Sequence, residues 1–96
     1  RNEVPSYYGA DSQIDDCIVA DGCTLEGKAS HSVLFRGVKL GKNAQVRDCV
    51  IMQDTEIGEG AELECVILDK NVVVSPGKKL FGTKEHPLVF KRGEIV

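Results

Sequence analysis

The chain has 96 residues, enough for one domain but not for two, and its 42% hydrophobic and 28% charged residues are typical of a soluble folded domain. Its net charge of −3 is spread along the chain without a block of like charges, which excludes the basic surface of a nucleic-acid-binding protein. No segment reaches the roughly 18 apolar residues of a membrane-spanning helix, and the N-terminal segment RNEVPSYYG lacks the apolar core of a signal peptide, so we expect a cytoplasmic protein.

Large apolar side chains recur about every six residues from Tyr8 onward, with a phase that resets once per turn. They are Tyr8 and Ile14, Val19 and Leu25, then Leu34, Leu40 and Val46, then Ile51, Ile57 and Leu63, and finally Ile67 and Val73. The segments between them are β-branched and punctuated by Gly, Asp and Asn, which favours short strands and turns over helices. We expect these side chains to form the inner column of a hexapeptide-repeat β-solenoid.

A longer period groups the units into rows that begin at Cys17, Ser32, Cys49 and Cys65. A period of about 18 residues in three units describes a triangular coil whose strands pair in parallel with the next coil. The sequence therefore predicts an all-β solenoid of about four to five coils over residues 8–81, in which the shorter rows have trimmed corners. The clearest units are LGKNAQ (40–45) and IGEGAE (57–62).

The same rows place Cys17, Ser32, Cys49 and Cys65 at one repeat position. We therefore expect three of the four cysteines to stack as small, buried, reduced residues beside the inner column. A Cys49–Cys65 disulfide is geometrically conceivable if the two strands are neighbours, but a reducing cytosol disfavours it.

Both ends of the chain depart from the repeat. After Gly82 the sequence reads TKEHPLVFKRGEIV, in which 88–90 and 94–96 flank Lys91-Arg92-Gly93 and are predicted to form a hairpin-like cap. We assign 82–96 to a C-terminal tail or cap. Residues 1–7 are interpreted as a linker, because the abrupt start at Arg1 suggests a piece of a longer protein.

Candidate catalytic residues are few. The two histidines, His31 and His86, cannot supply a three-histidine zinc site. His31 is predicted to lie in the inward column at a shortened corner, as a hydrogen-bonded corner residue and not a base, because a base would need a positioned partner. His86, before Pro87, is predicted to be a solvated loop residue. We assign no catalytic, metal or cofactor site.

A cationic cluster is the one candidate binding feature. Arg36, Lys39, Lys42 and Arg47 fall within one coil, and Arg36 and Lys39 could contact an anion. The alternative is an ordinary solvated outer face with acids nearby.

Three segments of the phased repeat resemble the C-terminal domain of bacterial glucose-1-phosphate adenylyltransferase. They are an SVLF coil (32–35), a CVIM coil (49–52) and ILDKNV (67–72), within a likeness that runs from about residue 7 to 76. The ending KKLFGTKEHPLVFKRGEIV is more similar to the regulatory, glycogen-biosynthesis subunit of firmicutes.

The resemblance implies a left-handed parallel β-helix and a preceding nucleotidyltransferase domain, which binds ATP and glucose 1-phosphate and carries all catalytic residues. This chain would then be non-catalytic. In the family the β-helix packs against the catalytic domain, joins subunits into oligomers and helps form sites for sugar-phosphate or nucleotide effectors. Basic residues of the SVLF coil take part in some members, which gives Arg36 a possible role.

Two other functions stay open at this point. A free-standing hexapeptide acyltransferase would form a trimer with a histidine base in a cleft, although such enzymes often extrude a long loop that this chain lacks. The equivalent domain of another sugar nucleotidyltransferase, such as one acting on mannose 1-phosphate, is the third interpretation.

Overall fold

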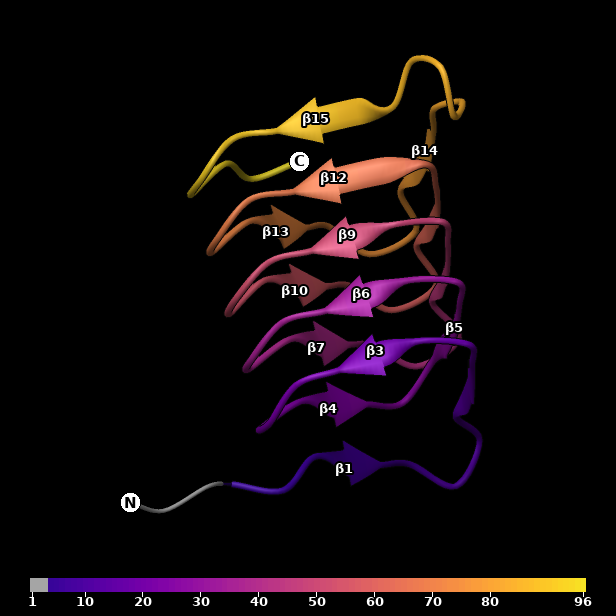
Figure 1. Ribbon diagram of the computed structural model, residues 1–96, viewed down its shortest axis with the longest axis vertical. Helices are drawn as coiled ribbons and strands as arrows, with labels where there is room; N and C mark the ends of the chain where they lie inside the picture. The colour runs from indigo at the N-terminus through magenta and orange to yellow at the C-terminus, as the bar shows by residue number, and fades with distance from the viewer. Residues whose placement is uncertain (1–3) are drawn as a thin grey trace.

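The computed structural model describes residues 4–96, which form a parallel β-solenoid of short strands arranged in three sheets (Figure 1). Sheet A contains β1 (Tyr7–Tyr8), β4 (Thr24–Leu25), β7 (Lys39–Leu40), β10 (Glu56–Ile57) and β13 (Val73–Val74). Sheet B contains β2 (Gln13–Asp15), β5 (Lys28–Ser30), β8 (Gln45–Arg47), β11 (Glu62–Glu64) and β14 (Lys79–Phe81). Sheet C contains β3 (Ile18–Val19), β6 (Val33–Leu34), β9 (Val50–Ile51), β12 (Val66–Leu68) and β15 (Leu88–Phe90). The predicted all-β solenoid is confirmed.

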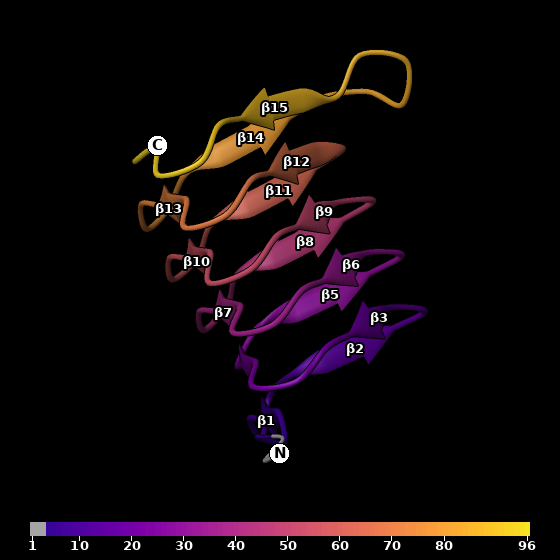
Figure 2. The ribbon, with the colours of Figure 1, turned by 60° about the vertical axis from the view of Figure 1, so that its left-hand side comes forward.

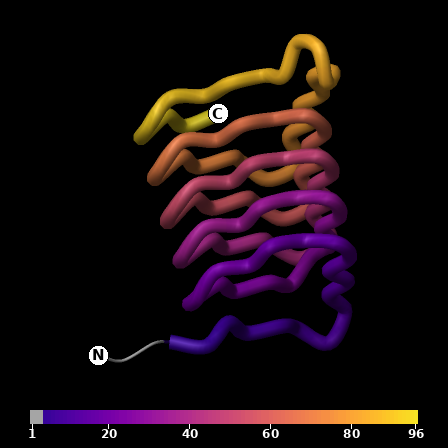
Figure 3. The backbone as a smooth tube through the Cα atoms, viewed as in Figure 1, coloured from indigo at the N-terminus to yellow at the C-terminus, as the bar shows by residue number. Residues whose placement is uncertain are grey.

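The coil is left-handed, as the resemblance implied. In Figure 1 the near strands of sheet C run from right to left and the far strands of sheet A run from left to right, while the chain rises from the N-terminus at the bottom. Figure 2 shows the three sheets as the sides of one prism, and the tube in Figure 3 shows the coils stacked in register. The first part of the predicted linker, residues 1–3, lies outside the described residues.

The core is a stack of aliphatic side chains, one from each strand of each coil. Strand pairing places residues such as Leu25, Leu40, Ile57 and Val74 directly above one another. The most deeply buried members are Leu25, Leu34, Leu40, Ile51, Leu63, Leu68, Val46 and Val74. Each large aliphatic side chain stabilises the fold by about 1.5–3 kcal/mol when fully buried, before its ordering entropy is subtracted.

The coils are one to three residues shorter than the predicted period of about 18, and the predicted phase is wrong near the C-terminal end, where it changes which residues face inward. Leu40 to Ile57 and Ile57 to Val74 are each one coil of 17 residues, whereas Leu25 to Leu40 is a coil of 15. Near the C-terminal end, the buried residues are therefore Leu68 and Val74, not the predicted Ile67 and Val73.

Cys65 is the origin of this phase error. The cysteine column was predicted to contain Cys17, Ser32, Cys49 and Cys65, but pairing of β9 with β12 places Val66 above Cys49. Cys65 instead occupies the one-residue corner between sheets B and C, with a left-handed φ of 53°. Asp16, His31 and Asp48 occupy the same corner in the coils below, with φ between 48° and 53°. All four cysteines are free thiols.

The predicted hairpin at the C-terminal end is also wrong. Strand β15 pairs in parallel with β12, and Ile95 forms a parallel bridge with Val73. The Val73 amide donates to the Glu94 carbonyl at 2.9 Å, and the Val96 amide donates to the Val73 carbonyl at 2.8 Å. Pairing thus continues beyond residue 81, and the last residues begin another coil.

Candidate functional site

The outer side of sheet C carries a ladder of aliphatic side chains. Strand register stacks one β-branched residue from each strand, and these five residues are named here the outer ladder: Ile18, Val33, Val50, Ile67 and Val89. Ile18 is 70% exposed and Val89 is 61% exposed, while the three between them are half-buried by their neighbours. Figure 1 looks onto this side of the molecule.

Neighbouring apolar residues widen the outer ladder at the corner that follows sheet C. Phe35 comes directly after β6 and is 41% exposed, and Met52 takes the same place after β9. Successive residues of a strand point to opposite faces, so two adjacent aliphatic residues put one in the core and one outside. A contiguous, partly exposed apolar face on a folded domain marks an interaction surface for a protein, a membrane or a ligand.

The outer sides of sheets A and B are different in character. Sheet B presents Lys28, Gln45, Arg47, Glu62, Glu64 and Lys79 to solvent or near it. Sheet A presents Lys39 beside Thr24 and Glu56, which are its strand neighbours. Alternating charges of this kind are the usual solvated face of a strand. The exposed apolar residues on the outer sides of these two sheets, Tyr7, Val73 and Phe81, lie in the first or last strand of their sheet, so within residues 4–96 an apolar ladder that continues from coil to coil is found on sheet C alone.

The structure separates the four basic residues of the predicted cationic cluster. Arg36 lies at the corner between sheets C and A, and Lys39 begins β7 on sheet A, so these two exposed residues are near each other along the chain. Lys42 lies at the next corner. Arg47 ends β8 on sheet B and donates to Glu64 at 3.0 Å.

Arg36 and Lys39 both have acidic neighbours. The Asp54 amide donates to the Arg36 carbonyl at 2.9 Å, which sets Asp54 on the coil directly above. Lys39 pairs with Glu56 in the strand register, where opposite charges attract across neighbouring strands.

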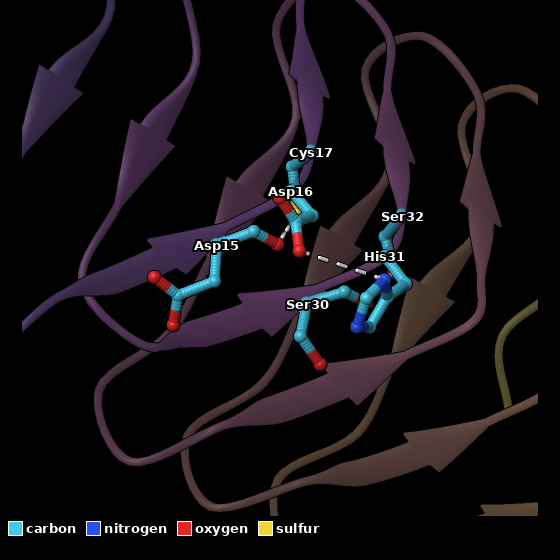
Figure 4. Close-up of polar contacts among 6 residues, drawn as sticks. All are labelled: Asp15, Asp16, Cys17, Ser30, His31 and Ser32. Atoms are coloured by element: carbon cyan, nitrogen blue, oxygen red, sulfur yellow. Dashed lines mark hydrogen bonds and ion pairs between the residues drawn. The ribbon is translucent and has the colours of Figure 1, made fainter.

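His31 does not lie in the inward column. It is the corner residue between β5 and β6, and its side chain is 64% exposed. Its Nδ1 is 3.9 Å from Asp16 Oδ2 on the coil below, and the Asp16 side chain is 78% exposed, so this is a long polar contact open to solvent (Figure 4). His86 is exposed in the turn from Thr83, as predicted for a loop residue.

Cys17 lies close to this corner in Figure 4, which raises the question of a cysteine nucleophile. Its thiol donates to the Asp15 carbonyl at 3.3 Å. Burial raises the pKa of Cys17, and the nearby Asp15 and Asp16 carboxylates add to that shift. A reactive cysteine needs a lowered pKa, so Cys17 is a protonated structural thiol at neutral pH.

Cys49 is a second structural thiol, buried in the wall of the core. Burial raises the pKa of Cys49 to about 11. Its amide donates to Ser32 Oγ at 3.1 Å, and its thiol donates to the Arg47 carbonyl at 3.1 Å. The first bond links Cys49 to the neighbouring coil, and the second links it to the preceding corner of its own coil. Among the residues that the structure describes, no three His, Cys, Asp or Glu side chains gather as metal ligands would.

Sequence reasoning missed the outer ladder. Adjacent pairs such as Ile18-Val19, Val33-Leu34 and Val50-Ile51 carry its signal, because one residue of each pair has to face outward in a strand. The six-residue periodicity predicts only the inward member of each pair.

The fold and its outer faces define a class of protein, the parallel β-helices built from hexapeptide repeats. A family model described as "GlmU-like, C-terminal hexapeptide" matches residues 4–86. The chain belongs to this family. Residues 4–96 contain no helix long and apolar enough to cross a membrane.

Two kinds of relative share sequence with most of the chain. It is 43% identical over 95 residues to "Glycogen biosynthesis protein GlgD" of Bacillus subtilis (strain 168), a match over 99% of this chain and 28% of that protein. It is 33% identical over 76 residues to "Glucose-1-phosphate adenylyltransferase" of Bacillus thuringiensis (strain Al Hakam), over 79% of this chain and 20% of that enzyme. The chain thus spans less than a third of each relative, and these matches agree with the resemblance found from the sequence.

A solved structure with a related shape is perosamine N-acetyltransferase from Caulobacter crescentus, in complex with CoA and GDP-perosamine. It aligns with 97% of this chain and 51% of that chain at a TM-score of 0.42 and 12% sequence identity. This degree of likeness carries no functional argument.

Proposed function

We propose that this chain is the non-catalytic C-terminal assembly and regulatory domain of a protein of the glucose-1-phosphate adenylyltransferase type, acting in ADP-glucose synthesis for glycogen in the cytoplasm. The single observation that carries the proposal is the outer ladder on sheet C. Its exposed aliphatic side chains would be covered by an N-terminal nucleotidyltransferase-type domain of the same polypeptide.

The choice of occupant rests on how the relatives are built. This chain corresponds to only 28% of the glycogen biosynthesis relative and 20% of the adenylyltransferase, so most of each relative consists of other sequence. A domain joined to the solenoid by a short connection is held at high effective concentration, so a modest apolar face suffices to dock it. Sister subunits of an oligomer are further partners in this proposal.

The experiment measures binding between this chain and the remaining part of the Bacillus subtilis relative, purified separately. We expect association that the substitution Ile67→Asp abolishes, because a carboxylate between Val50 and Val89 in the outer ladder would be desolvated in the contact. Glu56→Gln on sheet A, at the same height in the solenoid, is the matched control and should bind like the unmodified chain. Equal binding by the Ile67→Asp and Glu56→Gln variants would show that the outer ladder is not the contact surface.

Catalysis provides a separate check. The purified 96-residue chain, incubated with ATP and glucose 1-phosphate, is expected to form no ADP-glucose. Turnover by the chain alone would overturn the non-catalytic assignment.

The regulatory part of the proposal concerns Arg36 and Lys39. Arg36 adjoins Phe35, which borders the outer ladder, so an anionic effector bound there would sit at the edge of the proposed domain contact. Sugar phosphates or nucleotides would supply the anion. Phosphate binding, measured by NMR on the chain, should weaken in a Lys39→Ala variant and stay unchanged in Lys79→Ala, a control lysine on sheet B. Unchanged phosphate binding in both variants would show that Lys39 does not bind the anion.

A further inference from the structure

One corner of the solenoid is two residues shorter than its counterparts. The corner between sheets A and B contains four residues in most coils, as in 9–12, 41–44 and 58–61. In the coil of β4 and β5 only Glu26 and Gly27 lie between the two strands. Gly27 still packs against the next coil as the glycines of the longer corners do, since a Cβ there would lie 2.6 Å from the carbonyl oxygens of Gly41 and Ala44.

The missing residues leave a notch between the corners above and below. Its volume is about 640 Å³, which falls within the range of small-ligand sites, roughly 300–1,000 Å³. Its polar lining, named here the notch residues, consists mainly of Tyr7, Asp11, Gln13, Glu26, Lys28, Lys42 and Asn43. In Figure 1 the chain between β4 and β5 turns directly upward, at the lower right, whereas the connection after β1 bulges outward.

The notch also interrupts a stack of backbone hydrogen bonds. At this corner the Gly60 amide donates to the Lys42 carbonyl at 2.9 Å, and the Gly77 amide donates to the Glu59 carbonyl at 2.9 Å. The equivalent donor one coil lower is the Asn43 amide, whose acceptor would be a residue that the short corner omits. Within residues 4–96 no hydrogen bond is made by the Asn43 amide. A donor therefore faces the notch from its upper wall.

The charges of the notch residues select the chemistry of a ligand. The ammonium groups of Lys28 and Lys42 are balanced by the carboxylates of Asp11 and Glu26. A simple anion would meet two carboxylates, and a simple cation would meet two ammonium groups. A neutral ligand with many hydroxyl groups can instead donate to the carboxylates. It can also accept hydrogen bonds from the lysines, from the side-chain amides of Gln13 and Asn43, and from the backbone amide of Asn43.

Tyr7 adds an apolar surface to this polar set. The Tyr7 side chain is 58% exposed at the first strand of sheet A. A tyrosine ring offers a flat apolar face together with one polar group, which suits the C–H face of a sugar ring. The combination of balanced charges, amides and an exposed aromatic ring is suited to carbohydrate.

We propose that the notch binds a neutral polyhydroxylated ligand, a short oligosaccharide. The site is separate from the outer ladder on sheet C and from Arg36, so it does not depend on the proposed assembly function.

The test titrates the chain with maltotriose and, separately, with inorganic phosphate, following backbone amide signals by NMR. Maltotriose should cause saturable shifts at the notch residues in the millimolar range, and phosphate should cause none there. Glu26→Gln and Tyr7→Ala should each weaken maltotriose binding by about tenfold, whereas the matched control Glu62→Gln on sheet B should leave it unchanged.

A second variant closes the notch without removing any side chain that lines it. Inserting Lys-Asn between Glu26 and Gly27 gives this corner the length of the corner above and supplies an acceptor for the Asn43 amide. This variant should melt at the same or a higher temperature and should lose maltotriose binding. Absence of maltotriose binding by the unmodified chain, undiminished binding by a folded insertion variant, or phosphate shifts at the notch that exceed those of maltotriose would each overturn the proposal. If the insertion variant does not fold, unchanged binding by Glu26→Gln overturns it.

Discussion

Sheet C carries two apolar ladders on its opposite sides. The inner ladder consists of Val19, Leu34, Ile51, Leu68 and Phe90, and the outer ladder of Ile18, Val33, Val50, Ile67 and Val89. Leu68 is fully buried, whereas its neighbour Ile67 is only partly covered. The two ladders are similar in chemistry and adjacent in sequence, but the first holds the solenoid together and the second is available to a partner.

The difference teaches that hydrophobicity alone does not assign a residue to the core of a solenoid. Whether a residue is buried depends on which side of its strand it occupies. That side is set by the number of residues in the preceding corner. A slip of one residue exchanges the two ladders completely, as in any strand with a side-chain period of two.

The largest expected effect distinguishes the two ladders directly. Leu68→Ala should lower the free energy of unfolding by about 2–5 kcal/mol, because it leaves a cavity in the inner stack. Ile67→Ala should lower it by less than about 1 kcal/mol, because its side chain is already partly in water. Urea denaturation of both variants gives the values. Equal losses would mean that the inner and outer ladders are not distinct.

The stability at alkaline pH tests the burial of Cys49, which lies between the corner and the inner-ladder residue Ile51. The folded-state pKa of Cys49, about 11, exceeds the ordinary thiol value of 9.0 because of burial. The unfolded chain therefore releases this proton first, and stability should be full below pH 9 and fall between pH 9 and pH 11. The expected loss is on the order of 2 kcal/mol.

The control for this prediction is Cys49→Ala, which lacks the thiol but keeps every lysine and tyrosine. Unfolding by urea at pH 8 and pH 10.5 should show a smaller decrease for the variant than for the unmodified chain. A decrease of the same size in both would assign the pH dependence to other groups.

Both ladders stay in register because the coils are evenly spaced. This spacing depends on glycines at the corner between sheets A and B. A Cβ on Gly58 would lie 2.5 Å from the Pro76 nitrogen, so Gly58→Ala should destabilise the chain by about 1–3 kcal/mol. Gly60, with φ of 73°, has no atom within 4 Å of its Cβ position, and Asn43 adopts φ of 60° at the same corner. Gly60→Asn should therefore be nearly neutral in thermal unfolding. A Gly60→Asn loss as large as that of Gly58→Ala would contradict this packing.

The smallest expected effect is on sheet B, whose outer side is charged. Arg47 and Glu64 form an ion pair at 3.0 Å with both side chains about half exposed. Such pairs contribute only about 0.2–1 kcal/mol, so Arg47→Ala should change the unfolding free energy by no more than this. The contribution should shrink at 1 M salt, and a salt-independent loss well above this range would show a different role for Arg47.

The sequence was sufficient for the fold class, the three-sided coil and the inward positions from Leu25 to Leu63. It failed where corner lengths change, because a one-residue or two-residue difference leaves the spacing of apolar residues nearly intact. The segment Cys65-Val66-Ile67-Leu68 is entirely apolar, so hydrophobicity alone could not show which residue is the corner. Its likeness to Cys49-Val50-Ile51 suggested the wrong alignment.

The candidate sites were less accessible to sequence reasoning for a related physical reason. The outer ladder is visible only once the strands are in register, because its members are far apart in sequence. The notch depends on the absence of residues after Glu26, and the short row that begins at Cys17 shows that residues are missing without showing at which corner. The anion contact of Arg36 and Lys39 stays a prediction, and the separation of these two residues from Lys42 and Arg47 around the coil was not predicted.

The most direct test labels the methyl groups of Ile, Leu and Val and records their NMR signals while the remaining part of the Bacillus subtilis relative is added. Methyl signals of Ile18, Val33, Val50, Ile67 and Val89 should shift or broaden together, and those of Leu34, Ile51 and Leu68 should change much less. Changes confined to residues outside sheet C, or equal changes in both ladders, would contradict the assignment of the outer ladder as the contact surface.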